Sequence, residues 1–128
     1  MTDSNASAVV QEFWRRMATN DFPSVAELLA PDFVLEWPQS KERIRGPERF
    51  TQMNVEYPAQ GRWRFAVNRL VGGDTEVVTD VTVTDGVVIA RAVTFFTVAQ
   101  GRVARIVEYW PEPYAAPASR GHLVERMD

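Results

Sequence analysis

The chain has 128 residues, of which 45% are hydrophobic and 24% are charged, a size and composition that favour one globular domain with one core. Its formal net charge of −3 provides no general attraction for nucleic acid or for an anionic membrane. The absence of cysteine and the single histidine exclude a disulfide framework and a histidine-rich metal site.

The sequence shows neither a targeting signal nor a membrane segment. The first residues, MTDSNAS, lack the basic and apolar regions of a signal peptide. No apolar run approaches the roughly 20 residues that are needed to cross a bilayer. We therefore expect a cytoplasmic protein that binds neither nucleic acid nor membrane.

Helical patterns dominate the first part of the chain. Apolar residues recur at i, i+3, i+4 and i+7 and predict a helix over Ser7–Thr19. A short second helix is expected from Pro23, and it should stop at Pro31. Alternation over Phe33–Trp37 then predicts a first strand, which Pro38 ends.

A third helix follows a polar loop that we expect over residues 38–45. Gly46 and Pro47 begin this helix, and Pro58 ends it. Its inner face should carry four side chains: Phe50, Met53, Asn54 and Tyr57.

The pattern changes from helices to strands at Gly61. Residues 62–71 alternate, a Gly-Gly-Asp turn follows, and three further strands are expected at residues 77–84, 87–98 and 102–110. Helices followed by a long antiparallel meander predict a single α+β domain over residues 1–128, with residues 111–128 as a C-terminal tail.

Three charged residues lie within runs that read as buried strands: Asp80, Arg91 and Glu108. The pair Asp85-Gly86 predicts a two-residue type I′ turn, which would place Asp80 opposite Arg91. A second turn at Gly101 would place Glu108 diagonal to Arg91 on the same inner face. Unpaired charge on an inner face is costly, so the cluster is a candidate catalytic site. The alternative is a structural ion-pair network.

The opposite face of the predicted sheet is apolar as well. Helices of this size cover one face only, and an uncovered apolar face is typical of a contact surface. We therefore expect a homodimer that packs through ten residues: Val77, Val81, Val83, Ala90, Ala92, Phe96, Val98, Val103, Val107 and Tyr109.

Aromatic residues and one amide predict a pocket for an apolar, cyclic small molecule. The expected ligand-binding residues are Trp37, Asn54, Tyr57, Trp63, Phe95 and Trp110. Trp110 should face the cavity and Trp37 should lie near its mouth. Ordinary core packing is the alternative for the aromatic residues, and capping of a nearby backbone group is the alternative for Asn54.

Four stretches resemble the SnoaL-like branch of the nuclear-transport-factor-2-like (NTF2-like) superfamily: NDFPSVAELLAPDFV, IRGPERF, the Asp-Gly hairpin, and FFTVAQGRVARIVEYW. The resemblance implies a cone, in which a curved antiparallel sheet wraps around N-terminal helices. The superfamily includes polyketide cyclases, ketosteroid isomerase, limonene epoxide hydrolase, dehydratases and catalytically silent binding proteins. The fold alone therefore leaves the reaction open.

The resemblance to ketosteroid isomerase does not extend to its chemical groups. Where that enzyme has its oxyanion-hole tyrosine, this chain has Phe13, and where it has its aspartate base, this chain has Trp37. Its second, protonated aspartate corresponds to Val93 or a neighbour. The mechanism of that enzyme is therefore not expected here.

Limonene epoxide hydrolase offers a closer match. Its two acidic positions correspond to Asp80 and Glu108, while its arginine corresponds to Val78. We expect Arg91 to supply that charge from the neighbouring strand. Glu108 would then be the base, Asp80 the acid or its partner, and Arg91 the positive charge that tunes both.

Two classes of function remain open beside catalysis. An enzyme of this type would carry out isomerisation, cyclisation, dehydration or epoxide hydrolysis without a cofactor or a metal. The alternatives are a non-catalytic small-molecule binding protein and a structural dimerisation module.

Overall fold

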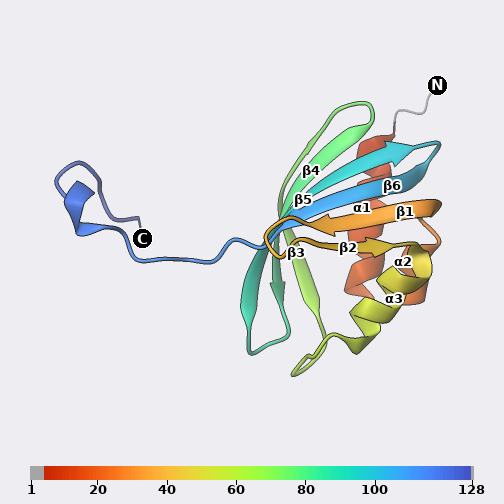
Figure 1. Cartoon of the computed structure of the whole chain (residues 1–128), viewed down its shortest axis with the longest axis horizontal. Helices are drawn as coiled ribbons and strands as arrows, with labels where there is room; N and C mark the ends of the chain where they lie inside the picture. The colour runs from red at the N-terminus through yellow and green to blue at the C-terminus, as the bar shows by residue number, and fades with distance from the viewer. Residues whose placement is uncertain (1–4, 128) are drawn as a thin grey trace.

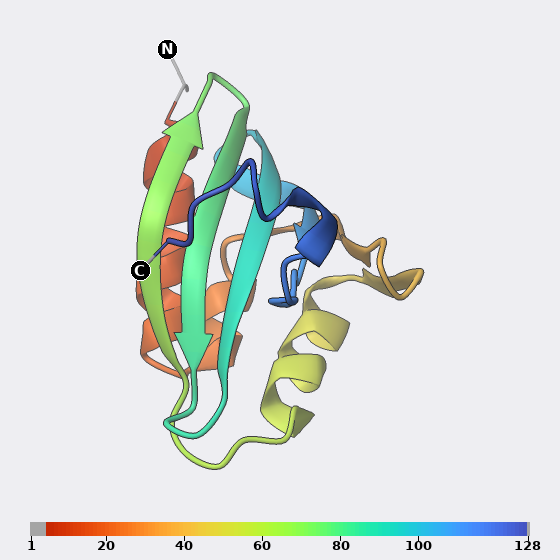
Figure 2. The same ribbon diagram turned by 90° about the vertical axis from the view of Figure 1, so that its left-hand side faces the viewer.

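The computed structural model describes residues 5–127, which form three α-helices packed against one face of a curved six-stranded sheet (Figures 1 and 2). The strand order is β2-β1-β6-β5-β4-β3, and only the β1–β6 pair, in the interior of the sheet, is parallel. The helices are α1 (Ala6–Ala18), α2 (Phe22–Ala26) and α3 (Pro47–Glu56). The strands are β1 (Leu29–Trp37), β2 (Glu42–Arg45), β3 (Arg64–Gly72), β4 (Glu76–Thr84), β5 (Ile89–Ala99) and β6 (Arg102–Tyr109).

The predicted α+β domain is confirmed, and α1 forms the central part of its core. The expected apolar stripe is buried against the inner face of the sheet, which is the face that the helices cover. Phe13 and Trp14 each make an edge-to-face contact with Phe96 of β5. The indole Nε1 of Trp14 donates a buried hydrogen bond of 3.1 Å to Oγ1 of Thr79.

Two element boundaries differ from the predictions. Leu29 lies in β1 and pairs with Val103 of β6, rather than ending the second helix. The β1–β6 register shifts between Leu29 and Val34, and this irregularity accommodates Pro31, which cannot donate to a regular ladder. The expected polar loop over residues 38–45 also contains β2, which pairs antiparallel with β1.

The assignment of the two sheet faces was wrong for β4, β5 and the start of β6, whereas Val107 and Tyr109 lie on the outer face as expected. Phe96, Val77 and Val81, which we expected in a dimer interface, lie on the inner face and are buried under the helices. Alternation along a strand separates its side chains into two sets, but it does not say which set the helices cover. The outer face instead carries Asp80 and Arg91.

The two predicted hairpins deviate in different ways. The β4–β5 turn contains the four residues 85–88, so Thr84 pairs with Ile89, and Asp80 and Arg91 remain on one face as diagonal neighbours. The β5–β6 hairpin pairs Val98 with Val103, but a one-residue bulge follows. Beyond the bulge every β6 side chain changes face, and Glu108 lies on the inner face.

Residues 111–127 extend away from the body and include the short 3₁₀ turn η1 (Ala118–Arg120) (Figure 1). All of these residues are exposed. Over residues 5–127, no helix has both the length and the apolar character that a bilayer crossing requires.

Candidate functional site

A buried carboxyl group lies on the inner face, near the C-terminal ends of β1 and β6. The side chain of Glu108 accepts two hydrogen bonds. The indole Nε1 of Trp37 donates to Oε1 at 3.0 Å, and the hydroxyl of Thr94 donates to Oε2 at 2.7 Å. Glu108 is 8% exposed and Thr94 is fully buried. Three strands therefore contribute to one polar cluster within an apolar core.

The local fold fixes this cluster in two ways. The bulge in the β5–β6 hairpin places Glu108 directly opposite Thr94 in the ladder. The turn between β1 and β2 is held to the end of β6, because Gln39 accepts a hydrogen bond of 2.5 Å from the backbone N–H of Trp110 and donates one of 3.3 Å to its carbonyl. The indole of Trp37 is thus positioned beside the carboxyl group.

Burial raises the pKa of Glu108 above its ordinary value, because the apolar surroundings disfavour the charged form. The hydrogen-bonding side chains of Trp37, Thr94 and Trp110 act in the opposite direction, since they favour the carboxylate. A carboxyl group with a raised pKa keeps its proton to a higher pH than an ordinary one, which suits it to exchange a proton with a bound molecule.

The expected cluster of Asp80, Arg91 and Glu108 does not form. Arg91 and Asp80 make a two-pronged ion pair on the outer face, with Nε–Oδ1 and Nη2–Oδ2 distances of 2.5 and 2.6 Å. The Asp80 side chain is 21% exposed and that of Arg91 is 58% exposed. The hydrogen bond with Arg91 lowers the pKa of Asp80 below its ordinary value. Glu108 lies on the other face of the sheet, because of the bulge in β6.

The six predicted ligand-binding residues do not line one site. Trp37 lies beside Glu108, and the side chain of Trp110 contributes to its pKa. Trp63 is half-buried and makes an edge-to-face contact with Tyr57, which is 57% exposed. Phe95 projects from the outer face, against the prediction, because its neighbour Phe96 occupies the inner position.

Asn54 bonds a nearby backbone group, which was the alternative to a ligand-binding role. Its Nδ2 donates a hydrogen bond of 2.9 Å to the carbonyl of Phe50, one turn earlier in α3. The amide therefore bonds the helix backbone, as Asn side chains commonly do.

Sequence reasoning overlooked Thr94, which directly contacts the carboxyl group of Glu108. The sequence did carry a signal: Thr94 is a polar residue between Ala92 and Phe96, which share its face of the strand. A buried hydroxyl needs a partner, and this requirement pointed to a polar group on the adjacent strand.

Two surface hollows lie away from Glu108. The first, of about 320 Å³, lies on the sheet, and its walls include Val78, Phe95, Thr97, Arg105, Val107 and Tyr109. The second, of about 350 Å³, lies between α1 and β3, and its walls include Trp14, Phe65 and Leu70.

Comparisons with known proteins agree with this architecture. The family described as SnoaL-like domain matches residues 10–106. The crystal structure of a candidate ketosteroid isomerase from Kribbella flavida is 35% identical, covers 100% of this chain and 94% of its own, and has a TM-score of 0.90. Among curated proteins, none matches significantly.

Two further solved structures show how varied the relatives are. A limonene-epoxide-hydrolase-like enzyme from M. tuberculosis is 26% identical, covers 83% of this chain and 82% of its own, and has a TM-score of 0.66. A protein from Catenulispora acidiphila with a ketosteroid-isomerase-like fold, in complex with trimethylamine, is 9% identical, covers 79% of this chain and 83% of its own, and has a TM-score of 0.68. The second likeness shows the fold alone.

Proposed function

The chain belongs to the SnoaL-like domain family, and we propose that it binds an apolar, cyclic small molecule and uses Glu108 for acid–base catalysis without a cofactor. Trp37 and Trp110 would form the aromatic wall of the binding site beside Glu108. The proposal includes a cytoplasmic location and a homodimer that packs through the outer face of the sheet.

The observation that carries the proposal is the burial of Glu108 on the inner face with two defined hydrogen-bond donors. A buried carboxyl group is costly, and perturbed acids within a fold are frequent at functional sites. Among the described residues, Asp85 is the other buried acid, but its oxygens accept backbone hydrogen bonds in the β4–β5 turn. Glu108 is therefore the better candidate for proton transfer.

A single carboxyl group favours isomerisation over epoxide hydrolysis. Hydrolysis of an epoxide uses one group to activate water and a second to protonate the leaving oxygen, whereas Asp80 lies on the other face of the sheet. A proton shift within one ligand needs a single proton-transferring group, and Glu108 would supply it from β6, whereas the position of the aspartate base of ketosteroid isomerase is occupied by Trp37 of β1. The Glu108 carboxylate would accept a proton from a carbon next to a carbonyl group, and the resulting acid would return a proton to another carbon of the same molecule.

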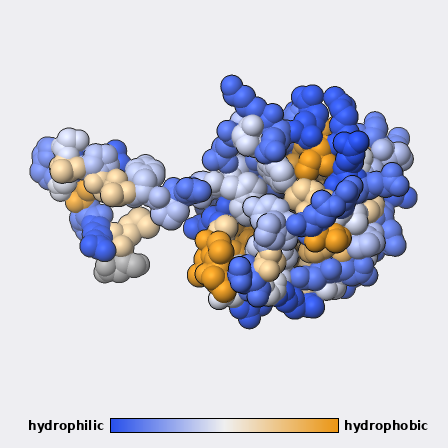
Figure 3. Space-filling model, turned by 60° about the horizontal axis from the view of Figure 1, so that its bottom comes forward, coloured by the Kyte–Doolittle hydropathy of each residue, from blue (hydrophilic) through white to orange (hydrophobic). Residues whose placement is uncertain are grey.

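The surface around the β4–β5 turn suits an apolar ligand. Val87, Val88 and Ile89 are exposed there. The view that brings this end of the body forward shows separate apolar patches on an otherwise hydrophilic surface (Figure 3). A hydrogen bond of 2.8 Å from the backbone of Gln60 to Asp85 holds this turn against the segment that leads to Trp63.

One observation favours non-catalytic binding as the second candidate. Both oxygens of Glu108 already accept hydrogen bonds from side chains of the protein. The same arrangement would suit a fixed polar group that orients a bound ligand without exchanging a proton with it.

A panel of cyclic β,γ-unsaturated ketones, with cyclic epoxides as the second class, tests the proposal. Binding is followed by tryptophan fluorescence and turnover by mass spectrometry in D₂O, where a proton shift introduces deuterium. We expect Glu108→Gln to bind the ketones as the wild type does and to lose turnover by about 10²–10⁴-fold. Asp80→Asn is the matched control, and it should retain both properties.

The outcomes separate the candidates. Turnover of ketones by Glu108→Gln at the wild-type rate would show that the carboxyl group is structural. Binding of ketones by the wild type without deuterium incorporation would favour the binding protein. Hydrolysis of epoxides that depends on Asp80 would overturn the argument from a single carboxyl group.

A further inference from the structure

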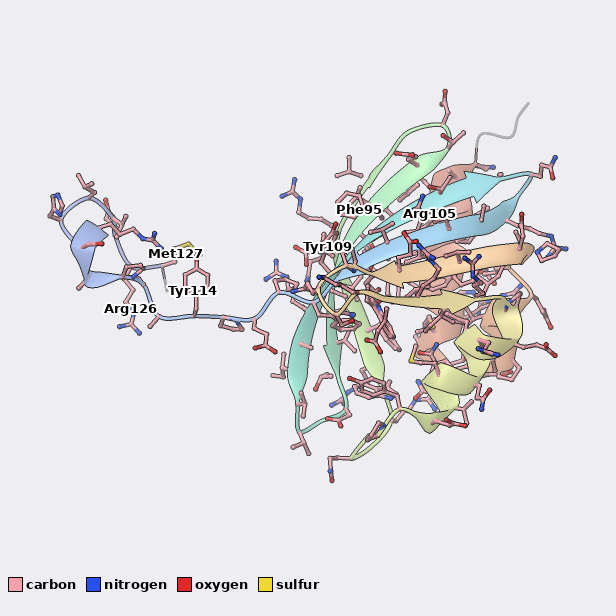
Figure 4. All side chains as sticks on the ribbon, in the orientation of Figure 1. Phe95, Arg105, Tyr109, Tyr114, Arg126 and Met127 are labelled. Carbon is pink, nitrogen blue, oxygen red and sulfur yellow. The ribbon has the colours of Figure 1, made fainter. Side chains whose placement is uncertain are left out.

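The C-terminal arm, residues 111–127, extends away from the rest of the described residues. Every residue of the arm is exposed, and its backbone hydrogen bonds to residues 5–127 are internal, such as that from the N–H of Gly121 to the carbonyl of Ala118. Its large apolar side chains are among the most exposed in the described chain, with Tyr114 at 80%, Leu123 at 76% and Met127 at 91%. Figure 4 shows Tyr114 and Met127 well away from the body.

Proline residues keep the first half of the arm extended. Pro111, Pro113 and Pro117 fix their backbone angles and lack N–H donors. A proline-rich spacer of this kind spans about 3.1 Å per residue, so the segment up to Pro117 reaches about 20 Å from Trp110. The spacer therefore holds η1 away from its own sheet, on the side of the outer face (Figures 1 and 2).

The outer face presents an apolar surface beside the origin of the arm. Phe95 is 44% exposed and Tyr109 is 37% exposed, and their rings meet edge to face at a centroid distance of 6.1 Å. Both residues line the hollow of about 320 Å³. Polar pairs flank this surface, Asp80 with Arg91 on one side and Glu36 with Arg105 on the other.

We propose that the C-terminal arm of each chain packs on the body of a second copy, with the outer sheet faces of the two copies in contact and the arms exchanged. This inference rests on the homodimer included in the proposed function. Each arm begins two residues after Tyr109 and projects beyond the outer face, so a second copy seated on that face lies alongside the arm (Figures 2 and 4).

The partner of the arm is a second copy of this chain, because each chain supplies both an arm and a body on which an arm can pack. An isologous interface repeats each contact about a two-fold axis, so the two outer sheet faces meet each other and each arm packs on the body of the other copy beside them. Stable interfaces bury about 1,200–2,000 Å² in total, and two exchanged arms add their surface to that of the sheets. The alignment with the Kribbella flavida structure covers the entire chain, and thus includes the arm.

The first test measures self-association by sedimentation equilibrium on the full chain. We expect the double substitution Leu123→Ser/Met127→Ser to weaken dimerisation at least tenfold. The matched control is Val87→Ser/Ile89→Ser, which removes equally exposed apolar side chains from the β4–β5 turn and should leave dimerisation unchanged. Equal dimerisation of both variants would overturn the role of the arm.

The second test identifies the copy that the arm contacts. Ser119→Cys provides a single thiol in a chain without cysteine, and a nitroxide attached there broadens nearby amide signals. In a mixture of nitroxide-labelled chains and ¹⁵N-labelled, unmodified chains, we expect broadening around Phe95 and Tyr109 of the ¹⁵N-labelled chains. If broadening occurs only in a sample whose chains carry both the nitroxide and ¹⁵N, the arm packs on the body of its own chain. That result would overturn the exchange of arms.

Two remaining outcomes are also decisive. If the protein is a dimer but neither the mixed nor the same-chain sample shows broadening, the dimer proposal stands and the arm contact is overturned. If the protein is a monomer, both the dimer and the arm contact are overturned. Ligand binding and the Glu108-dependent turnover are measured separately, so failure of the arm exchange does not affect the outcome for the catalytic proposal.

Discussion

The indole of Trp37 donates a hydrogen bond of 3.0 Å to the carboxyl group of Glu108, although the two residues lie 71 positions apart in the sequence. This contact joins the end of β1 to the end of β6. It also opposes the effect of burial on Glu108, because it favours the carboxylate while the apolar surroundings favour the acid.

Removing the indole donor should therefore raise the pKa of Glu108 further. We expect this shift in Trp37→Phe, together with a loss of stability of about 1–2 kcal/mol from the unmade hydrogen bond. The titration is followed by the ¹³C signal of the Glu108 carboxyl group. Trp63→Phe is the control and should leave that signal unchanged. A lower pKa in Trp37→Phe would contradict the geometry of the cluster.

The stability of the protein should depend on pH through Glu108. Its pKa is raised in the folded state, so the stabilisation is present below the pKa of the unfolded chain and is lost as the pH rises through the folded pKa. Urea unfolding between pH 4 and pH 8 should show this loss in the wild type. Glu108→Gln does not titrate and should not show it, so its stability relative to the wild type should increase with pH. Parallel pH profiles would contradict this prediction.

Asp85 should make the stability of the protein depend on pH in the opposite direction. Backbone N–H groups of Gln60, Val88 and Val87 bond its carboxylate and lower its pKa to about 2. Its stabilisation is therefore present above the unfolded pKa and is lost as the pH falls through the folded pKa. In thermal unfolding, Asp85→Asn should melt below the wild type at pH 7, and the difference should shrink toward pH 2. Asp74→Asn, in the β3–β4 turn at the other end of β4, is the control.

The outer ion pair should be independent of the inner cluster. Arg91→Gln should leave the titration of Glu108 unchanged, because the guanidinium bonds Asp80 on the other face of the sheet. The loss of stability should be small, as is typical of exposed pairs. A shift in the ¹³C titration of Glu108 in this variant would restore the three-residue cluster that the sequence suggested.

The neighbours Phe95 and Phe96 should respond very differently to truncation. Phe96 is 1% exposed and packs on Phe13 and Trp14, so Phe96→Ala should cost about 3–5 kcal/mol in urea unfolding. Phe95 is 44% exposed, and Phe95→Ala should have little effect on unfolding measured at low protein concentration. Similar losses in both variants would show that the two faces are assigned wrongly.

Local patterns in the sequence were sufficient to predict the class of fold and most elements. The stripe of α1, the start of α3 at Pro47 and the last four strands are determined by nearby residues, and these predictions are confirmed. Leu29 and β2 were missed because their pairing partners are set by the tertiary fold. Residues such as Leu29 have no local preference strong enough to choose between helix and strand.

The candidate site was harder to predict because it depends on strand register. The β4–β5 turn has two residues more than expected, and an even shift kept Asp80 and Arg91 on the same face. The bulge in β6 is an odd shift, and it moved Glu108 to the other face. The residues on either side of Ala104, Val103 and Arg105, do not signal this bulge, since neither is a glycine or a proline.

The interior position of the parallel β1–β6 pair has a consequence for the order of folding. Leu29 must pair with Val103, so the sheet joins segments that are made far apart in time on the ribosome. Such distant pairings slow folding, because the intervening loop must close before the contact is gained. The helices and β1 therefore cannot complete their packing until the β5–β6 hairpin forms. Their apolar surfaces remain exposed to chaperones until β6 emerges from the ribosome.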